Sequence, residues 1–222
     1  MSEKGLQIEK IKLSDIAGKR IREMIIKKEL KSGERIVETR IAKMLGISQA
    51  PVREALKELE VMGLVEIKPY SGCYVVPIDK KKLLQIYSLR TMLESFAAKQ
   101  GAENISETVI KQMEKHIKSM KKAAANMDTA ALVESDVLFH REIVKVANNK
   151  TLERMWELIG APQWSSITIS AKENPNYEYF ANSHNELLRL FKQRNIDAVP
   201  DELEKHFSTA ASFIIEGVVE SE

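Results

Sequence analysis

Four side chains able to bind a metal ion lie on the apolar faces of three predicted helices. Asp136 and His140 are four residues apart, so they share one helix face, which also carries valine and isoleucine. His184 and His206 lie among leucine and phenylalanine residues of two later helices. An unpaired buried carboxylate is costly, so we expect these groups to face one another. Three imidazoles and one carboxylate inside a helical bundle are suited to a divalent cation and leave one or two positions open on an octahedral ion.

Each of these histidines has a simpler explanation when it is considered alone. A single histidine on an apolar helix face is more often a hydrogen-bonded core residue than a metal ligand. Three such histidines together with an aligned aspartate favour the metal site. The fourth histidine, His116, lies on a helix rich in lysine, and we expect it at the solvent-exposed surface.

A second group of side chains suited to binding lies near the N-terminus. Two short helices, predicted over 39–45 and 49–62, are joined by the turn 46–48. This order is typical of a helix-turn-helix, whose second helix enters the major groove of DNA. The apolar side chains of the second helix are Val52, Ala55, Leu56 and Leu59. The residues left on its outer side are Gln49, Ala50, Arg53 and Lys57.

The types of these outer residues predict how they bind. Arg53 has a planar guanidinium suited to guanine or to a phosphate, and Gln49 can pair with adenine. Arg40 begins the preceding helix, where a contact to the DNA backbone or groove edge is expected. Gly72, at the tip of a predicted hairpin, allows the backbone to approach DNA closely. The alternative is a small helical domain whose charged residues are merely solvated.

The elements that position both groups of side chains divide the chain in two. The predicted order is a helix over 13–30, the two short helices, and a β-hairpin with strands at 64–68 and 73–76. From residue 79 onward the pattern is helical, with helices expected near 80–101, 105–126, 129–148, 151–160, 163–171, 177–194 and 198–218. The fold class is therefore mainly α: a winged helix-turn-helix domain over 1–78 and an all-helical bundle over 79–222.

Composition and charge agree with this division. Residues 1–78 carry 15 basic and 11 acidic residues, whereas residues 79–222 carry 19 and 21, so the first part is the one expected to meet a polyanion. No run approaches the roughly 18 apolar residues needed to cross a membrane. Residues 1–5 are polar and lack the apolar core of a secretory signal. A single cysteine, Cys73, favours a reducing cytoplasm.

The stretch 11–77 resembles the DNA-binding domain of the GntR family. The residues that carry this resemblance are 29–35, 39–42, Leu45-Gly46-Ile47-Ser48, Pro51-Val52-Arg53-Glu54-Ala55-Leu56, Leu59-Glu60 and Gly63-Leu64-Val65. The resemblance implies that Arg40, Arg53 and the wing glycine Gly72 contact DNA. The family commonly has Arg-Thr where this chain has Gln49-Ala50, which leaves the operator sequence open but not the DNA-binding role.

Residues 79–222 resemble the FCD effector domain of FadR-like GntR regulators. The resemblance rests on the block 136–143 with Asn148-Asn149 and Leu152, and on the segments around His184 and His206. It implies that Asp136, His140, His184 and His206 hold a divalent ion, zinc or nickel. A small organic acid is then expected beside the ion, with Arg90 as its carboxylate partner. Arg90 can instead form a helical ion pair with Glu94, and the hydroxyl-rich segment 163–170 can add polar contacts.

These features predict a regulator rather than an enzyme. The main hypothesis is a homodimeric transcriptional repressor, with no catalytic residues, whose winged helices bind double-stranded operator DNA under the control of a metabolite. One alternative is a metal sensor that uses the same four residues. A less favoured alternative is a metal-dependent hydrolase, for which the sequence offers no convincing second carboxylate or base.

Overall fold

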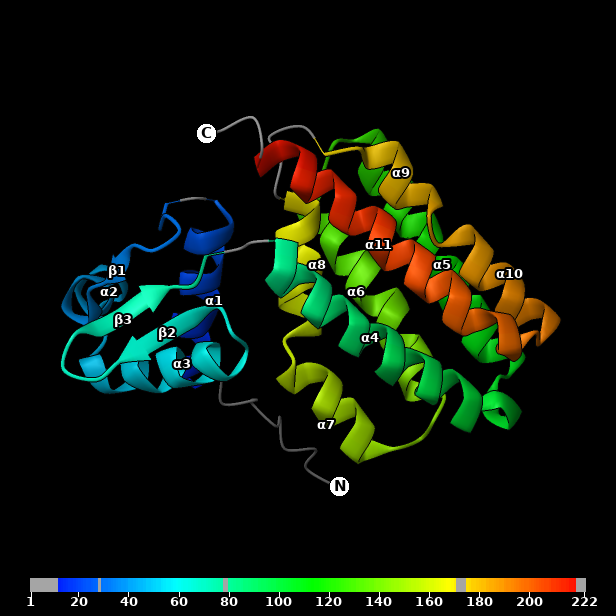
Figure 1. Cartoon of the computed structure of the whole chain (residues 1–222), viewed down its shortest axis with the longest axis horizontal. Coiled ribbons are helices and arrows are strands. Elements are labelled where there is room, and N and C mark those ends of the chain that lie inside the picture. The colour runs from blue at the N-terminus through cyan, green and yellow to red at the C-terminus, as the bar shows by residue number, and fades with distance from the viewer. Residues whose placement is uncertain (1–11, 28, 78–79, 171–174, 219–222) are drawn as a thin grey trace, which may run out of the picture. The chain divides into compact units, whose positions relative to one another are not determined.

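The computed structural model describes residues 12–27, 29–77, 80–170 and 175–218, except for the side chain of residue 80 and a few side chains in the helices that contain residues 161–170 and 199–218. Contacts divide the chain into two compact units, Met1–Pro77 and Ile78–Glu222. Figure 1 shows a small helical unit with a sheet and a larger unit of packed helices.

The first unit is a winged helix-turn-helix, as the sequence predicted. Its elements are α1 (Leu13–Ile26), β1 (Arg35–Ile36), α2 (Glu38–Leu45), α3 (Gln49–Val61), β2 (Val65–Lys68) and β3 (Gly72–Val75). The strands form an antiparallel sheet in the order β1-β3-β2. The sequence did not predict β1, because two residues are too short to show an alternating pattern. It exists because Arg35 and Ile36 pair with Tyr74 and Cys73 of the central strand.

The turn between α2 and α3 fixes which face of α3 is exposed. Gly46 ends α2 in the left-handed conformation (φ 66°, ψ 29°), which suits a residue without Cβ. Ser48 is the N-cap residue of α3, as predicted, although its hydroxyl makes no capping hydrogen bond. The helix then buries Val52, Ala55, Leu56 and Leu59 completely or almost so, and it packs on α1. The opposite side of α3 is therefore held toward solvent.

The second unit is a helical bundle, and its described residues contain no strand. Its elements are α4 (Lys80–Gln100), the 3-10 helix η1 (Ala102–Asn104), α5 (Glu107–Ala125), α6 (Thr129–Lys145), α7 (Lys150–Leu158), α8 (Ala161–Ser170), α9 (Tyr177–Asn182), α10 (Asn185–Gln193), the 3-10 helix η2 (Ile196–Ala198) and α11 (Val199–Val218). Among the described residues of this unit, four helices begin at a side chain that accepts a hydrogen bond from the backbone N–H three residues later. These N-cap residues are Ser106, Asp128, Asn149 and Asn176.

The single helix predicted over 177–194 is wrong, because the chain forms two helices there. Helix α9 ends at Asn182, and α10 begins at Asn185 with His184 as its N-cap residue. The side-chain Nδ1 of His184 lies 3.2 Å from the carbonyl oxygen of Phe180, which in a continuous helix would accept from the backbone of residue 184. The break places the His184 ring inside the bundle.

Helix α6 lies within the bundle and contacts four of its other helices. It packs against α5, α8, α4 and α7, and α4 packs along α11, as Figure 1 shows. One part of the core consists of Ala97, Val144, Ala147, Leu152, Trp156 and Ala161. Within the part of the chain that the structure describes, no helix is both long and apolar enough to span a membrane.

Candidate metal centre and DNA-binding surface

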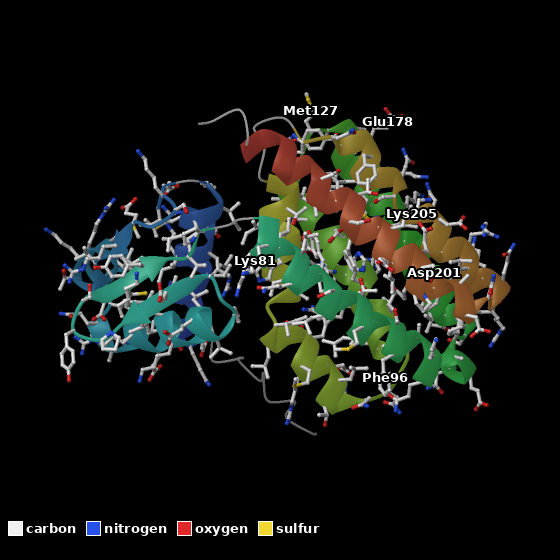
Figure 2. All side chains as sticks on the ribbon, in the orientation of Figure 1. Lys81, Phe96, Met127, Glu178, Asp201 and Lys205 are labelled. Carbon is white, nitrogen blue, oxygen red and sulfur yellow. The ribbon has the colours of Figure 1, made fainter. Side chains whose placement is uncertain are left out.

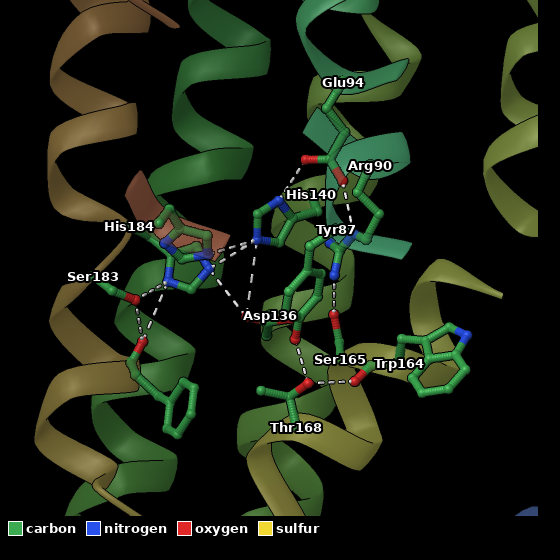
Figure 3. A network of polar contacts seen from close by, with 12 residues as sticks. Tyr87, Arg90, Glu94, Asp136, His140, Trp164, Ser165, Thr168, Ser183 and His184 are labelled. Atoms are coloured by element: carbon green, nitrogen blue, oxygen red, sulfur yellow. Dashed lines mark hydrogen bonds and ion pairs between the residues drawn. The ribbon is translucent and has the colours of Figure 1, made fainter. Parts of the chain in front are cut away.

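The four predicted metal ligands meet in the centre of the bundle. Asp136 and His140 come from α6, His184 from the start of α10, and His206 from α11. All four are buried, with at most 6% of each residue exposed. Each residue offers one nitrogen or oxygen atom as a ligand, and these four atoms all lie within 4.8 Å of one another. The rings of His140 and His184 and the carboxylate of Asp136 converge in Figure 3.

The distances between the donor atoms suit one shared ion. Nε2 of His140 lies 3.2 Å from Nε2 of His206 and 3.2 Å from Nε2 of His184. Oδ1 of Asp136 is 3.1 Å from Nε2 of His184 and 4.0 Å from Nε2 of His140. Donors bound to one zinc-sized ion at about 2.0–2.2 Å lie roughly 3–4 Å apart. Nitrogen and carboxylate donors in this arrangement therefore fit a divalent transition metal.

The groups behind two of the rings fix where their protons lie. Nδ1 of His140 is 2.7 Å from a carboxylate oxygen of Glu94, and Nδ1 of His184 faces the Phe180 carbonyl. The Glu94 carboxylate and the Phe180 carbonyl are both acceptors, so Nδ1 of each ring is placed to donate and Nε2 of each ring faces the other ligands. Nδ1 of His206 is buried and has no hydrogen-bond partner among the described residues.

Burial and charge keep the centre ready for a cation. Burial would raise the pKa of Asp136, but the hydrogen bond from His184 and the charges of His140 and Arg90 hold it far below its ordinary value. Burial lowers the pKa of His184 despite Asp136 beside it. Burial and the two neighbouring histidines lower the pKa of His206 further. The site therefore combines an ionised carboxylate with two imidazoles that resist protonation, as metal ligands require.

Arg90 of α4 lies beside the four ligands and is 1% exposed. Its Nε donates to Glu94 at 3.1 Å and its Nη1 donates to Ser165 of α8 at 2.8 Å (Figure 3). The helical ion pair that the sequence offered as an alternative is thus present. Nη2 is buried without a hydrogen-bond partner among the described residues, so one donor group of the guanidinium remains available. The ring of Phe207 lies 4.3 Å from the guanidinium carbon.

A small cavity lies between Arg90 and the predicted ligands. Its lining includes side chains of Tyr87, Arg90, Asp136, His140, Ser165, Thr168 and His206. Its volume of about 10 Å³ is close to the smallest that holds one water molecule. The hydroxyls of Tyr87 and Thr168 hydrogen bond to each other at its edge. The segment 163–170 thus contributes the hydroxyls of Ser165 and Thr168 to the cavity lining. The side chains of residues 163, 166 and 170 lie outside the described set.

Three residues of this centre were not identified from the sequence as parts of the site. Glu94 was considered only as a partner of Arg90, and its contact with His140 depends on the packing of α4 against α6. Trp156 donates from Nε1 to the same carboxylate at 2.9 Å, and Tyr87 lines the cavity. Of the three, only Glu94 could have been identified from the sequence, because an acidic residue on an apolar helix face needs a buried partner.

The expectation that His116 lies at the surface is wrong. It is 9% exposed, because the face of α5 that carries Met113, Ile117 and Met120 turns it toward α6. Burial lowers its pKa. It takes no part in the cluster of Asp136 and the other three histidines.

The predicted DNA-reading residues lie on the exposed side of the first unit. Gln49, Ala50, Arg40 and Arg53 are all exposed. Nε of Arg53 donates to Glu38 at 2.6 Å, and its Nη2 donates to Gln49 at 3.3 Å. Arg40 lies 4.0 Å from a carboxylate oxygen of Glu34. Two carboxylates therefore neighbour the two arginines in the free protein.

Gly72 starts β3 directly after the hairpin turn, at a φ of 123° that other residues rarely adopt. A Cβ at this position would lie 2.8 Å from Nε of Arg35 and 3.2 Å from its Nη2. The backbone conformation and the closeness of Arg35 therefore both explain why a glycine occupies this position, whatever it contacts on DNA. Arg35 is exposed beside it.

Comparison with known families and structures defines the class of the protein. Residues 13–75 match bacterial regulatory proteins of the gntR family, and residues 85–209 match the FCD domain. The chain therefore belongs to the GntR family of bacterial regulatory proteins and carries an FCD domain.

Particular relatives agree with this class. Over 143 residues the chain is 30% identical to the probable D-xylose utilization operon transcriptional repressor of Paenarthrobacter nicotinovorans, covering 64% of this chain and 63% of that one. It is 27% identical to the gluconate operon transcriptional repressor of Bacillus subtilis, covering 72% and 65%. Its fold matches Escherichia coli McbR/YncC with a TM-score of 0.76 and 20% identity, covering 94% and 99%. The domains and relatives are those of regulators, and the hydrolase alternative is not supported.

Proposed function

We propose that this chain is a cytoplasmic, sequence-specific DNA-binding transcriptional repressor. Its operator affinity is controlled by a small organic acid bound beside a divalent metal ion. Residues 1–78 bind DNA, and residues 79–222 bind the effector and form a homodimer. The observation that carries this proposal is the buried convergence of Asp136, His140 and their two partner histidines beside an arginine with a free donor group.

The DNA-binding role is supported by the exposed face of α3. Arg53 and Gln49 lie there side by side, and the buried face of the helix fixes their direction. Arg53 is proposed to read a guanine through its Nη atoms, because Nε faces Glu38 in the free protein. Gln49 and Ala50 are proposed to face neighbouring bases. Arg40 and the wing at Gly72 are proposed to contact the DNA backbone or the minor groove.

The metal role is supported by the donor set and its tautomers. Asp136 would hold the ion through Oδ1, and His140, His184 and His206 through Nε2. Imidazole and carboxylate donors suit zinc or nickel. Such an ion would supply a positive charge that attracts the carboxylate of an acid. The chain's own residues shape the rest of the site, with Arg90 as the second cationic contact.

The effector role of Arg90 is supported by its unpartnered Nη2. An arginine fork recognises a carboxylate through two adjacent N–H groups, and here one of its donors is occupied by Ser165. A cavity of about 10 Å³ is too small for an organic acid. Binding is therefore expected to open the Arg90–Ser165 contact and to move α8 away from α4. Gluconate, in the name of one relative's operon, is a small acid of the proposed class.

Dimer formation is supported by an apolar surface on the bundle. Leu89, Met92 and Phe96 lie on one face of α4 with 40–59% of each exposed, and Met155 and Leu158 of α7 are about half exposed. Helices α4 and α7 pack together, and Figure 2 labels Phe96 on this side. A second copy of the chain is the proposed occupant, since a palindromic operator presents two half-sites. Light scattering should show a dimer for the natural chain and a monomer for Met92→Glu with Phe96→Glu.

The experiment that tests the function uses operator DNA selected from a random pool by the full-length protein. Binding of this DNA is measured with metal-free protein, with Zn²⁺ or Ni²⁺, and with each ion plus gluconate or related acids. We expect an acid to weaken operator binding by the metal-loaded natural chain and to have little effect on operator binding by Arg90→Met. Affinity that follows free metal and ignores every acid would favour the metal sensor instead. If the protein enriches no sequence from the random pool, the DNA-binding role is refuted.

A further inference from the structure

Glu94 is a fully buried carboxylate behind the proposed metal ligands, and its two oxygens have different partners. Oε1 accepts from Nε of Arg90 at 3.1 Å and from Nε1 of Trp156 at 2.9 Å. Oε2 contacts Nδ1 of His140 at 2.7 Å. The exposed fraction of Glu94 is 0%, so all of these contacts are made away from solvent. In Figure 3, Glu94 lies on the side of the His140 ring opposite the other ligands.

The partners of Oε1 fix the orientation of the carboxylate. The indole N–H and the guanidinium Nε–H are donors only, so Oε1 must accept from both. Oε2 is thereby aimed at Nδ1 of His140, which must donate to it. The proton on Nδ1 leaves a lone pair on Nε2, the atom that lies 3.2 Å from Nε2 of His184 and of His206.

We propose that Glu94 is a positioning residue for metal binding, which holds His140 in the Nδ1–H tautomer and aims its Nε2 at the ion. This inference rests on the proposed metal site. Glu94 is not itself a ligand in this arrangement, because Oε2 contacts the His140 nitrogen on the far side of the ring and Oε1 contacts Arg90 and Trp156. Trp156 and Arg90 act one step further away by orienting Glu94.

A purely structural role would be to neutralise the buried guanidinium of Arg90. The variant Glu94→Gln separates the two roles because the amide has the size of the carboxylate but only one acceptor oxygen. Two donors at the Oε1 position select that place for the amide oxygen. The NH₂ group then faces Nδ1 of His140, which must become an acceptor, so the proton moves to Nε2. The wrong nitrogen would then point at the metal position.

The experiment compares the natural full-length chain with Glu94→Gln and with Glu153→Gln, the same change at a surface ion pair with Lys150 of α7, as the matched control. Long-range ¹⁵N NMR of the metal-free proteins reports which nitrogen of His140 carries the proton. Zn²⁺ affinity is measured by competition with a chelator. We expect Nδ1–H in the natural chain and in Glu153→Gln, and Nε2–H in Glu94→Gln. We also expect the Zn²⁺ affinity of Glu94→Gln to fall by about 10- to 100-fold, as for other groups that orient a metal-bound histidine.

Several results would overturn the inference. An Nε2–H tautomer in the natural metal-free chain would do so without any variant, even if Glu94→Gln fails to fold. Unchanged tautomer and affinity in folded Glu94→Gln would also do so, as would an equal loss of affinity in Glu153→Gln. A natural chain that has the Nδ1–H tautomer but does not bind Zn²⁺, Ni²⁺ or Co²⁺ would refute the proposed metal site. That result would leave the positioning of the His140 ring by Glu94 supported.

Discussion

Replacing Arg53 with alanine tests the proposed reading of DNA by α3. The side chain of Arg53 is 61% exposed, and its ion pair with Glu38 lies at the surface, where such pairs contribute about 0–1 kcal/mol. The buried face of α3 does not include it, so folding stability should change little. A bidentate contact to a base contributes about 1–3 kcal/mol, and its loss should weaken operator binding roughly 5- to 150-fold.

The assay is fluorescence anisotropy with the selected operator and with each of its single-base variants. The natural chain is compared with Arg53→Ala and with Arg154→Ala, which removes an equally charged, exposed arginine from α7. Arg53→Ala should also lose discrimination at one base pair of each half-site. If Arg53 contacts a phosphate instead, its removal should weaken binding to all sequences equally. It should also reduce the slope of log affinity against log salt concentration by about 1.

Unchanged operator affinity in Arg53→Ala would refute the assignment of α3 as the reading helix. An equal loss in Arg154→Ala would show that net charge, rather than a placed contact, explains the effect.

Three further predictions concern the metal centre and the wing. His140→Ala should lose the bound metal ion and the effector response while the first unit keeps its operator-binding fold; full metal occupancy, measured by elemental analysis, would contradict the ligand role. Because the pKa values of His184 and His206 are lowered in the folded state, the unfolded chain binds more protons below the ordinary pKa of about 6.5. The metal-free protein should therefore lose stability as the pH falls through this value, by up to about tenfold in the unfolding equilibrium per pH unit for each histidine; urea unfolding that is independent of pH from 7.5 to 5.5 would argue against two buried neutral rings. Gly72→Ala should destabilise the first unit by about 1–3 kcal/mol because of its φ of 123° and its closeness to Arg35, and unaltered urea unfolding would oppose this reason for the glycine.

Local sequence signals were sufficient to predict the fold of the first unit. Gly46 ends a helix in the left-handed conformation, and Pro69 to Ser71 separate two alternating strands. These features act over a few residues. Strand β1 depends on pairing with a distant strand, and no local pattern marks two residues as a strand.

The candidate site was predictable where helix periodicity places a polar residue on an apolar face. Asp136 and His140 share a face of α6, and His206 lies on the apolar face of α11. The break in the helix before His184 was not predictable, because a side-chain hydrogen bond to the Phe180 carbonyl replaces a backbone one. The role of Glu94 was hidden for a similar reason, since α4 and α6 are brought together only by packing.

The most direct test of the central claim is anomalous X-ray scattering from crystals of the full-length protein loaded with Zn²⁺ or Ni²⁺. We expect one strong peak per chain, bonded to Oδ1 of Asp136 and to Nε2 of His140, His184 and His206. No peak among these four residues, or an ion bound through Nδ1 of His140, would contradict it.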